Sequence, residues 1–536
     1  MARRLVLTAV LLAALLPVSG AGGVDAQTPK RGGTVVFGPV REPACLSPFR
    51  TACRNDASPA FTWIGENVLP PAHIRGSDFT LRPRLVSNVE YTRTPPFTLT
   101  FHIRREARWS DLVPVTARDF VFTHDVIRRV VARDSGDIHL QVRSVRKVDA
   151  KTVMVVLRSR NADWRSLFWT VLPRHALAGQ DLAEIWDDEI DNPKTGRAIG
   201  SGPFLVQRWE RGKQLTLVRN DRYWGPHVAH LDRIVIRFCR QVCNAPPGDE
   251  VLERLRQGEV DFAFARDTLI VSDLRRIPGI RVVAAPSNGW EHFDIRAVPG
   301  SHPALMDKRV RRALIYGIDR VAIVRRLFGE IDPKYQPSDN AIFLNTSRYY
   351  RANWGHYRYR PALARRLLSQ AGCRRGSDRI YICAGERLSL LVRTSGGQPV
   401  REQTLQLAQG QLRDAGIEVV PYFGGGDADL ALFAWFYFGE PVGFKDLYGC
   451  GGSQNDTGYC QRLVTNDLDQ ADRILDADQR ARVLNRADRQ MAKDVPVIPL
   501  FQVPLMFAYK VGLRGIDPAP FDPFWNAEDW WLAEPR

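Results

Sequence analysis

The chain has 536 residues, 44% of them hydrophobic and 25% charged, which is ordinary for a soluble globular protein and enough for about two to four domains. Its formal net charge is +16 at pH 7. Because the basic residues are spread along the whole chain and not gathered in one tract, this charge does not favour nucleic acid as a partner.

The N-terminal segment has the organisation of a secretory signal peptide. Arg3 and Arg4 precede an apolar run over residues 5–16, and small residues follow. The run is shorter than the roughly 20 residues of a membrane-spanning helix. We expect cleavage after Ala26, with a cut after Ala21 or an uncleaved anchor as alternatives. The protein is therefore predicted to be exported, periplasmic or otherwise extracytoplasmic. No cysteine directly follows the run, so it is predicted not to be lipid-anchored.

The first half of the mature chain alternates short strands with few helices. Residues 35–37 are predicted as a strand ended by Gly38-Pro39, and residues 97–103 alternate as another strand. Thr116 is the expected N-cap of a helix, with Asp119 three residues later as in a capping box. The other expected elements are strand pairs that turn at Asp149-Ala150 and near Gly212, a strand in "LDRIVIRF", and a helix ended by Gly258.

The second half has a plain α/β pattern. Residues 309–328 are predicted as one helix with the apolar stripe Val310, Leu314, Ile318 and Val321. The other expected elements are helices ended by Gly372 and Gly416, strands in "RLSLLVRTS" and "IEVVPY", and two helices before a strand in "VPVIPLFQ".

The stretch "DADLALFAWFYFGEP" begins as a buried strand and ends with more aromatic residues than a core strand needs. Because side chains alternate along a strand, Phe433, Trp435 and Tyr437 share one face, and Phe436 and Phe438 share the other. The Trp435 face therefore either packs in the core or lines a site that a ligand visits.

Eight cysteines fall into four close pairs along the sequence, and in an exported chain such pairs are typical of disulfides. Local pairing is the simplest of the 105 possible connectivities. A zinc site is the weaker alternative, and no metal is expected. The four pairs are Cys45 and Cys53, Cys239 and Cys243, Cys373 and Cys383, and Cys450 and Cys460.

Signatures of catalysis are missing from the sequence. There is no G-x-S-x-G, no Walker loop, no G-x-G-x-x-G after a strand and no H-E-x-x-H. Glu66, Asp294 and Glu440 serve as acid or base only if the fold brings them together. His227 and His230 are interpreted as loop histidines, with a pair of metal ligands as the weaker alternative. We therefore expect neither a catalytic residue nor a cofactor.

Seven segments, in order from about residue 31 to the C-terminus, resemble the family 5 extracytoplasmic solute-binding proteins of ABC importers, the oligopeptide, dipeptide and nickel type. The most recognisable are "TFHIRREARWSDLVPVTARDFVFTHDVI", "IGSGPFLVQRWERGKQLTLVRNDRYWG" and "RQGEVDFAF". The resemblance implies an α/β, two-lobed periplasmic-binding-protein fold of the class with an extra domain. Its lobes join at a hinge and close on a ligand in the cleft between them.

The family's plan also implies domain boundaries and partners for this chain. The expected parts are a signal peptide at 1–26, lobe I at 31–70, 190–287 and 505–536, an extra domain of lobe I at 71–189, and lobe II at 288–504. The expected partners are a peptide or other small solute and the permease subunits of an ABC transporter. The protein is expected to be a monomer.

In the family, the strand that ends in tryptophan runs up to the cleft, and the residues after it form the cleft wall. Rigid aromatic faces suit a cleft that admits solutes and expels water. The expected ligand contacts are Trp435, Phe436, Tyr437 and Glu440 in that region, Trp290, His292 and Asp294 on one face of the strand that crosses between the lobes, and Trp63.

The chain departs from the family's oligopeptide binders at two positions. Those proteins carry an aspartate shortly after the strand tryptophan, which pairs with the peptide ammonium, and an arginine three residues before it. Here Phe436, Tyr437 and Phe438 fill the first position and Leu432 the second. An unpaired buried charge costs several kcal/mol, so we expect a solute with apolar or ring surface rather than a peptide held by its amino terminus. Glu440 is the possible substitute for the aspartate and keeps peptides as an alternative.

Two other functions stay open at this point. An exported hydrolase would use Glu440 and Asp294 as acid and base, and turnover of ligand would reveal it. A structural envelope protein held by its positive charge would bind polyanions in a salt-sensitive way and would have no saturable site for a small ligand.

Overall fold

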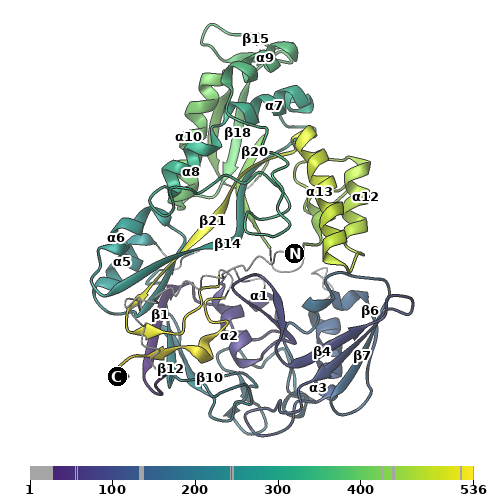
Figure 1. Cartoon of the computed structure of the whole chain (residues 1–536), viewed down its shortest axis with the longest axis vertical. Coiled ribbons are helices and arrows are strands. Elements are labelled where there is room, and N and C mark those ends of the chain that lie inside the picture. The colour runs from purple at the N-terminus through teal and green to yellow at the C-terminus, as the bar shows by residue number, and fades with distance from the viewer. Residues whose placement is uncertain are drawn as a thin grey trace, which may run out of the picture.

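A computed structural model of the chain describes residues 28–54, 56, 58–131, 138–241, 243, 247–424, 426–437, 441–519 and 522–534. The expected signal peptide and Glu440 lie outside these ranges. The described chain forms two lobes, one above the other in Figure 1, with the C-terminus in the lower lobe. In the described part of the chain, no helix combines the length and apolar character needed to cross a membrane.

One mixed sheet of ten strands runs through both lobes. Its two long central strands are antiparallel, with Ile280 opposite Lys510 at one end and Asp294 opposite Val497 at the other. These two strands carry the sheet from the lower lobe into the upper one (Figure 1). In sheet order the strands are β10 (Phe204–Glu210), β11 (Gln214–Arg219), β12 (Arg233–Phe238), β1 (Thr34–Val40), β13 (Phe262–Ala265), β21 (Val497–Lys510), β14 (Ile280–Ile295), β20 (Leu430–Phe436), β18 (Ser389–Thr394) and β19 (Glu418–Phe423).

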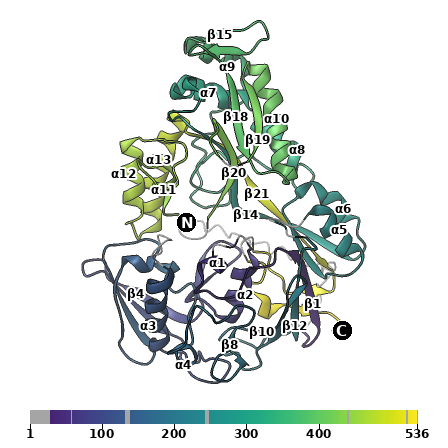
Figure 2. The same cartoon turned by 180° about the vertical axis from the view of Figure 1, so that it is seen from behind.

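Helices flank the sheet in both lobes. In the upper lobe, α8 (Arg320–Phe328) and α10 (Pro399–Ala415) lie on one side of β18 and β20, and α12 (Arg462–Ala471) and α13 (Ala477–Asp494) lie on the other, as both views show (Figures 1 and 2). The other helices of this lobe are α7 (Lys308–Gly317) and α9 (Pro361–Gln370), which lie near its upper end, and α11 (Phe444–Tyr448). The lower lobe contains α1 (Thr51–Arg54), α2 (Ala60–Val68), α4 (Arg174–Leu177), α5 (Gly248–Arg256) and α6 (Val271–Arg275).

A separate antiparallel sheet of four strands lies beside the lower lobe, in the order β4-β5-β7-β6. Alternating apolar residues bury one face of β5 and β7 against α3. The predicted capping box begins that helix, since Asp119 accepts from the Thr116 N–H at 2.7 Å and Thr116 accepts from the Arg118 N–H. The elements are β4 (Val86–Tyr91), β5 (Thr98–Ile103), α3 (Ala117–Val126), β6 (Val142–Lys147) and β7 (Thr152–Leu157).

Four small sheets complete the described strands. They are β2 (His73–Arg75) with β3 (Leu81–Pro83), β8 (Asp191–Asn192) with β9 (Arg197–Ala198), β15 (Arg374–Arg375) with β16 (Tyr381–Cys383) and β17 (Glu386–Arg387), and β22 (Leu513–Arg514) with β23 (Trp531–Leu532).

Two large hydrophobic cores divide the molecule. The first contains residues between Val35 and Phe264 and returns at Leu505 to Trp530. The second contains residues from Trp290 to Phe501. We call the parts of the chain around these cores lobe I and lobe II. Because the four-stranded sheet shares the first core, it is packed onto lobe I.

Two predicted element boundaries are wrong. The strand that begins at Thr34 does not end at Gly38-Pro39: it continues to Val40, which pairs with Phe238 after a bulge. The bulge accommodates a proline, which has no N–H to donate to the sheet.

The predicted single helix 309–328 is two helices. Ile318 has an extended backbone, and the Asp319 side chain caps the second helix by accepting from the Ala322 N–H at 2.9 Å. The new helix points in a different direction, which leaves Val321 exposed instead of in the apolar stripe.

Four disulfides join the cysteines in the local pairs, namely Cys45–Cys53, Cys239–Cys243, Cys373–Cys383 and Cys450–Cys460. Each one closes a loop within one lobe, so none of them ties the two lobes together.

Candidate functional site

A cavity of 540 Å³ lies where the two crossing strands leave lobe I. Its walls come from α2, from β2 and β3, from the segment 165–169, from the ends of β13 and β20, and from the middle of β14 and β21. The described residues that line it are Asp56, Ser58, Pro59, Thr62, Trp63, Glu66, Pro71, His73, Arg75, Leu81, Arg165, Ser166, Trp169, Phe264, Arg266, Ser287, Asn288, Phe436, Val503, Leu505 and Asp522.

Aromatic rings form much of this wall. The Trp63 ring, on α2, meets the Phe264 ring of β13 edge-on at 5.6 Å between centroids. Phe436 approaches from β20 of lobe II, and Gly289 beside it on β14 leaves room for its ring, since a Cβ there would lie 2.6 Å from a ring carbon. The cavity therefore offers apolar faces contributed by both lobes.

The aromatic stretch at the end of β20 divides between two environments. Phe436 lines the cavity, as does Trp63. Trp435 and Tyr437 are half-buried and pack against the core of lobe II. The Tyr437 N–H donates to the Asn288 carbonyl at 3.0 Å, which continues the pairing of β20 with β14. Glu440 lies outside the described residues.

The three predicted residues on the crossing strand form a buried cluster behind the cavity. His292 is fully buried and stacks on Trp290 at 4.3 Å between ring centroids. Its Nε2 lies 3.3 Å from Oδ1 of Asp294, which is also buried. The Trp435 ring stacks more distantly on His292, at 6.3 Å. These side chains lie within lobe II, and Trp63 and Phe436 are the predicted residues that the fold brings together at the cavity.

Three arginines that the sequence did not single out also line the cavity. They are Arg75, Arg165 and Arg266. Arg266 follows β13 directly, and its guanidinium lies 5.2 Å from the centroid of the Phe436 ring. A charged residue at the end of the buried strand "FAFA" is the one sequence signal that points to Arg266.

Two carboxyl groups in the wall have pKa values raised by burial. Burial raises the pKa of Glu66 to about 7, although the positive charge of Arg75 opposes this effect. Burial and the neighbouring Glu66 raise the pKa of Asp522 well above its usual range. His73, by contrast, is neutral, because burial and then the charge of Arg165 lower its pKa to about 4. The net charge of the cavity wall is therefore more positive than a count of its acidic and basic residues suggests.

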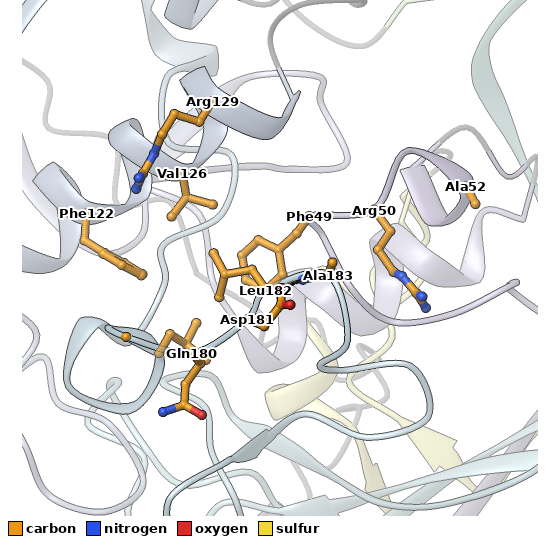
Figure 3. A pocket seen from close by; sticks show the side chains of 12 residues that line it. Phe49, Arg50, Ala52, Phe122, Val126, Arg129, Gln180, Asp181, Leu182 and Ala183 are labelled. Carbon is orange, nitrogen blue, oxygen red and sulfur yellow. Dashed lines mark hydrogen bonds between the residues drawn. The ribbon is translucent and has the colours of Figure 1, made fainter.

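A second, larger cavity of 780 Å³ lies on lobe I between α3 and the segment that follows α4. Figure 3 shows Phe49, Phe122, Val126 and Leu182 around it. All of its described lining residues fall between Phe49 and Ala183, so movement of lobe II cannot enclose it. The smaller cavity between the lobes is therefore the better candidate for a ligand site.

The described residues contain no group of three or more His, Cys, Asp or Glu side chains placed to hold a metal ion. His227 and His230 stack at 5.0 Å between ring centroids, and Nε2 of His227 lies 2.9 Å from Oδ1 of Asp529.

Comparison with known proteins gives consistent results. Residues 80–453 match the sequence profile of bacterial extracellular solute-binding proteins, family 5 Middle. The oligopeptide-binding protein OppA of Mycobacterium tuberculosis (strain ATCC 25618 / H37Rv) is 27% identical over 461 residues, covering 82% of this chain and 75% of that protein.

Two solved structures share the fold at 22% sequence identity. The periplasmic EDTA-binding protein EppA superposes with a TM-score of 0.84, covering 96% of this chain and all of that one. The oligopeptide-binding protein AppA from Bacillus subtilis, in complex with a nonapeptide, gives a TM-score of 0.74, covering 95% of this chain and all of that one. The chain belongs to the family 5 bacterial extracellular solute-binding proteins, and it has their two-lobed fold with a ligand cleft between lobes joined by a hinge.

Proposed function

We propose that the protein is the solute-binding component of an ABC importer, which captures a peptide-like or other small organic solute by hinge closure and delivers it to a membrane permease. The observation that carries this proposal is the cavity at the strands that cross between the lobes, walled by Trp63 from one lobe and Phe436 from the other. A solute that touches both walls stabilises the closed arrangement.

The hinge of this proposal consists of β14 and β21. The domain boundaries that go with it are 31–70, 190–287 and 505–536 for lobe I, 71–189 for its extra domain, and 288–504 for lobe II. The separation of the two hydrophobic cores between Phe264 and Trp290 and between Phe501 and Leu505 supports this division.

The proposed ligand contacts have two layers. Trp63 and Phe436 touch the solute directly, and Trp435, Tyr437 and Glu440 meet it when the lobes close. The buried group of Trp290, His292 and Asp294 holds the end of β20 in place from behind. This assignment is supported by the stacking of His292 on Trp290 and Trp435.

The range of solutes that we propose is narrower than the range bound by the family, but it includes more than one class of compound. Proteins similar to this chain bind oligopeptides, a nonapeptide, EDTA and a nickel–histidine complex. The aromatic residues Phe436 and Tyr437, where oligopeptide binders have an ammonium partner, favour a solute with apolar or ring surface. Peptides remain the alternative, with Glu440 in the role of the missing aspartate that pairs with the peptide ammonium.

The remaining parts of the proposal concern location and activity. The protein is exported by a signal peptide, residues 1–26, that is removed on export. It is not lipid-anchored, acts as a monomer without a cofactor, and returns its solute unchanged. Asp294 is only 2% exposed. Because a catalytic acid or base must reach its substrate, this burial is evidence against a hydrolase that uses Asp294 and Glu440.

The test is to express the protein with export, identify co-purifying solutes by mass spectrometry, remove them, and add them back. We expect a rise in melting temperature and a more compact form in small-angle scattering. At 100 times the dissociation constant, the gain in stability is about 2.7 kcal/mol. Chemical change of the solute, or binding without any change in scattering, would contradict the proposal.

A further inference from the structure

The wall of the interlobe cavity carries an arginine, Arg266, for which the described residues provide no ionic partner. Arg266 lies half-buried at the end of β13, where lobe I meets the crossing strands. Its guanidinium stacks on Phe436 at 5.2 Å. Among the residues that the structure describes, no carboxylate forms an ion pair with this guanidinium and no group accepts a hydrogen bond from it.

Glu291, the carboxylate whose charge raises the pKa of Arg266, is already ion-paired with another arginine. Glu291 on β14 binds Arg401 on α10 through both oxygens, at 2.5 Å from Nε and 3.2 Å from Nη2. The side chains of this pair are only 7% and 11% exposed. Burial, and after it the positive charge of Arg401, lowers the pKa of Arg266, and Glu291 offsets only part of this effect. A half-buried cation without a counter-ion has lost part of its hydration, and a bound anion offsets that cost.

The other charges in the cavity do not balance Arg266. Arg75 and Arg165 add positive charge to the same wall. Asp56 is committed elsewhere, because it pairs with Arg41 at 3.1 Å and accepts from the Ala44 N–H at 2.6 Å.

The remaining acidic residues of the wall, Glu66 and Asp522, carry at most one negative charge between them at neutral pH, because burial keeps Asp522 protonated. Apart from Asp56, which is paired with Arg41, the described lining therefore contains three arginines and at most one negative charge. The cavity is complementary to an anion.

We propose that the solute is an organic anion and that Arg266 binds one of its carboxylates. This inference rests on the proposed function, since it names the solute class of the same cavity. A guanidinium can donate two parallel N–H···O bonds to a carboxylate, and stacking on Phe436 fixes the plane in which they form. The Trp63 and Phe264 rings then cover the carbon skeleton.

The test uses the mature protein after removal of co-purified solute. The probes are phthalate, trimesate and nitrilotriacetate, with phthalamide and trimesamide as uncharged partners and a random tripeptide pool as the peptide arm. We expect at least one carboxylate, and the co-purified solute itself, to bind by calorimetry as anions. The matching amide should not bind.

Variants of Arg266 then assign the contact. Arg266→Gln should weaken carboxylate binding by about tenfold to a hundredfold, the range for hydrogen bonds to charged groups. Arg266→Lys keeps the charge but loses the paired geometry, so it should bind with intermediate affinity. The control is Arg208→Gln on β10, whose side chain is 73% exposed, and it should bind like the unmodified protein. Melting temperatures without ligand show that each variant is folded.

The possible outcomes separate this inference from the proposed function. If only neutral or cationic solutes bind and compact the protein, the inference is wrong while the importer function stands. Carboxylate binding that Arg266→Gln and Arg266→Lys leave unchanged also overturns it, and so does a panel in which no carboxylate binds. If no solute of any charge changes the scattering, the hinge-closing function itself fails.

Discussion

Glu66 is a residue of the cavity wall whose ionisation the fold changes. It is packed beside Asp522 and interacts with the positive charges of Arg75 and Arg84. Burial raises its pKa from an ordinary 4.5 to about 7. The folded protein therefore favours the neutral carboxyl. The stability that this preference contributes is complete below the unfolded pKa and is lost as the pH rises through about 7.

We expect Glu66→Gln to flatten the fall in melting temperature between about pH 5 and pH 8, because an amide cannot ionise. Asp488 and Asp472 also have pKa values raised by burial to about 6, so part of the slope should persist in the variant. Calorimetric scans at several pH values measure the difference. Glu184→Gln, at an exposed position, is the matched control. A variant that loses stability as steeply as the unmodified protein would refute this account of Glu66.

At the scale of elements, the break between α7 and α8 depends on one side chain. Asp319 caps α8 through the Ala322 N–H, and its own N–H donates to Oε1 of Gln411 at 2.8 Å. Removing an N-cap side chain costs about 1 kcal/mol. We expect Asp319→Ala to lower the free energy of unfolding in urea by that amount, and Asp319→Asn, which also caps, to change it little. Equal losses in the two variants would show that the cap is not the cause.

The same break shows what periodicity alone can predict. The strand pair of β6 and β7, and the end of α10 at Gly416 with φ of 87°, follow from local patterns, and the structure confirms them. The interruption at Ile318 was missed because the apolar spacing continues through it. Arg266 and Phe436 meet only because β13 and β20 are brought together by strands from elsewhere in the chain, which no local pattern records.

At the scale of the whole molecule, the disulfides stabilise each lobe without linking the two. Cys45–Cys53 and Cys239–Cys243 lie in lobe I, and Cys373–Cys383 and Cys450–Cys460 lie in lobe II. We expect the exported protein to begin near Gln27 and to take up no alkylating reagent until it is reduced, after which all its cysteines react. Intact-mass measurement decides this, and four or more labelled cysteines before reduction would be inconsistent with the pairing.

The pairing of β13 with β21 sets an order on how the chain can fold. Lobe I begins at the N-terminus, yet its core includes Leu505, Phe507 and Trp530 from the far end of the chain. When the ribosome has synthesised the chain up to residue 496, β21 has not yet been made. The strand that pairs with β13 in the sheet of lobe I is therefore still missing. Contacts this distant in sequence form late. We therefore expect the nascent protein to stay incompletely folded until synthesis is almost finished, which suits the export that we propose for it.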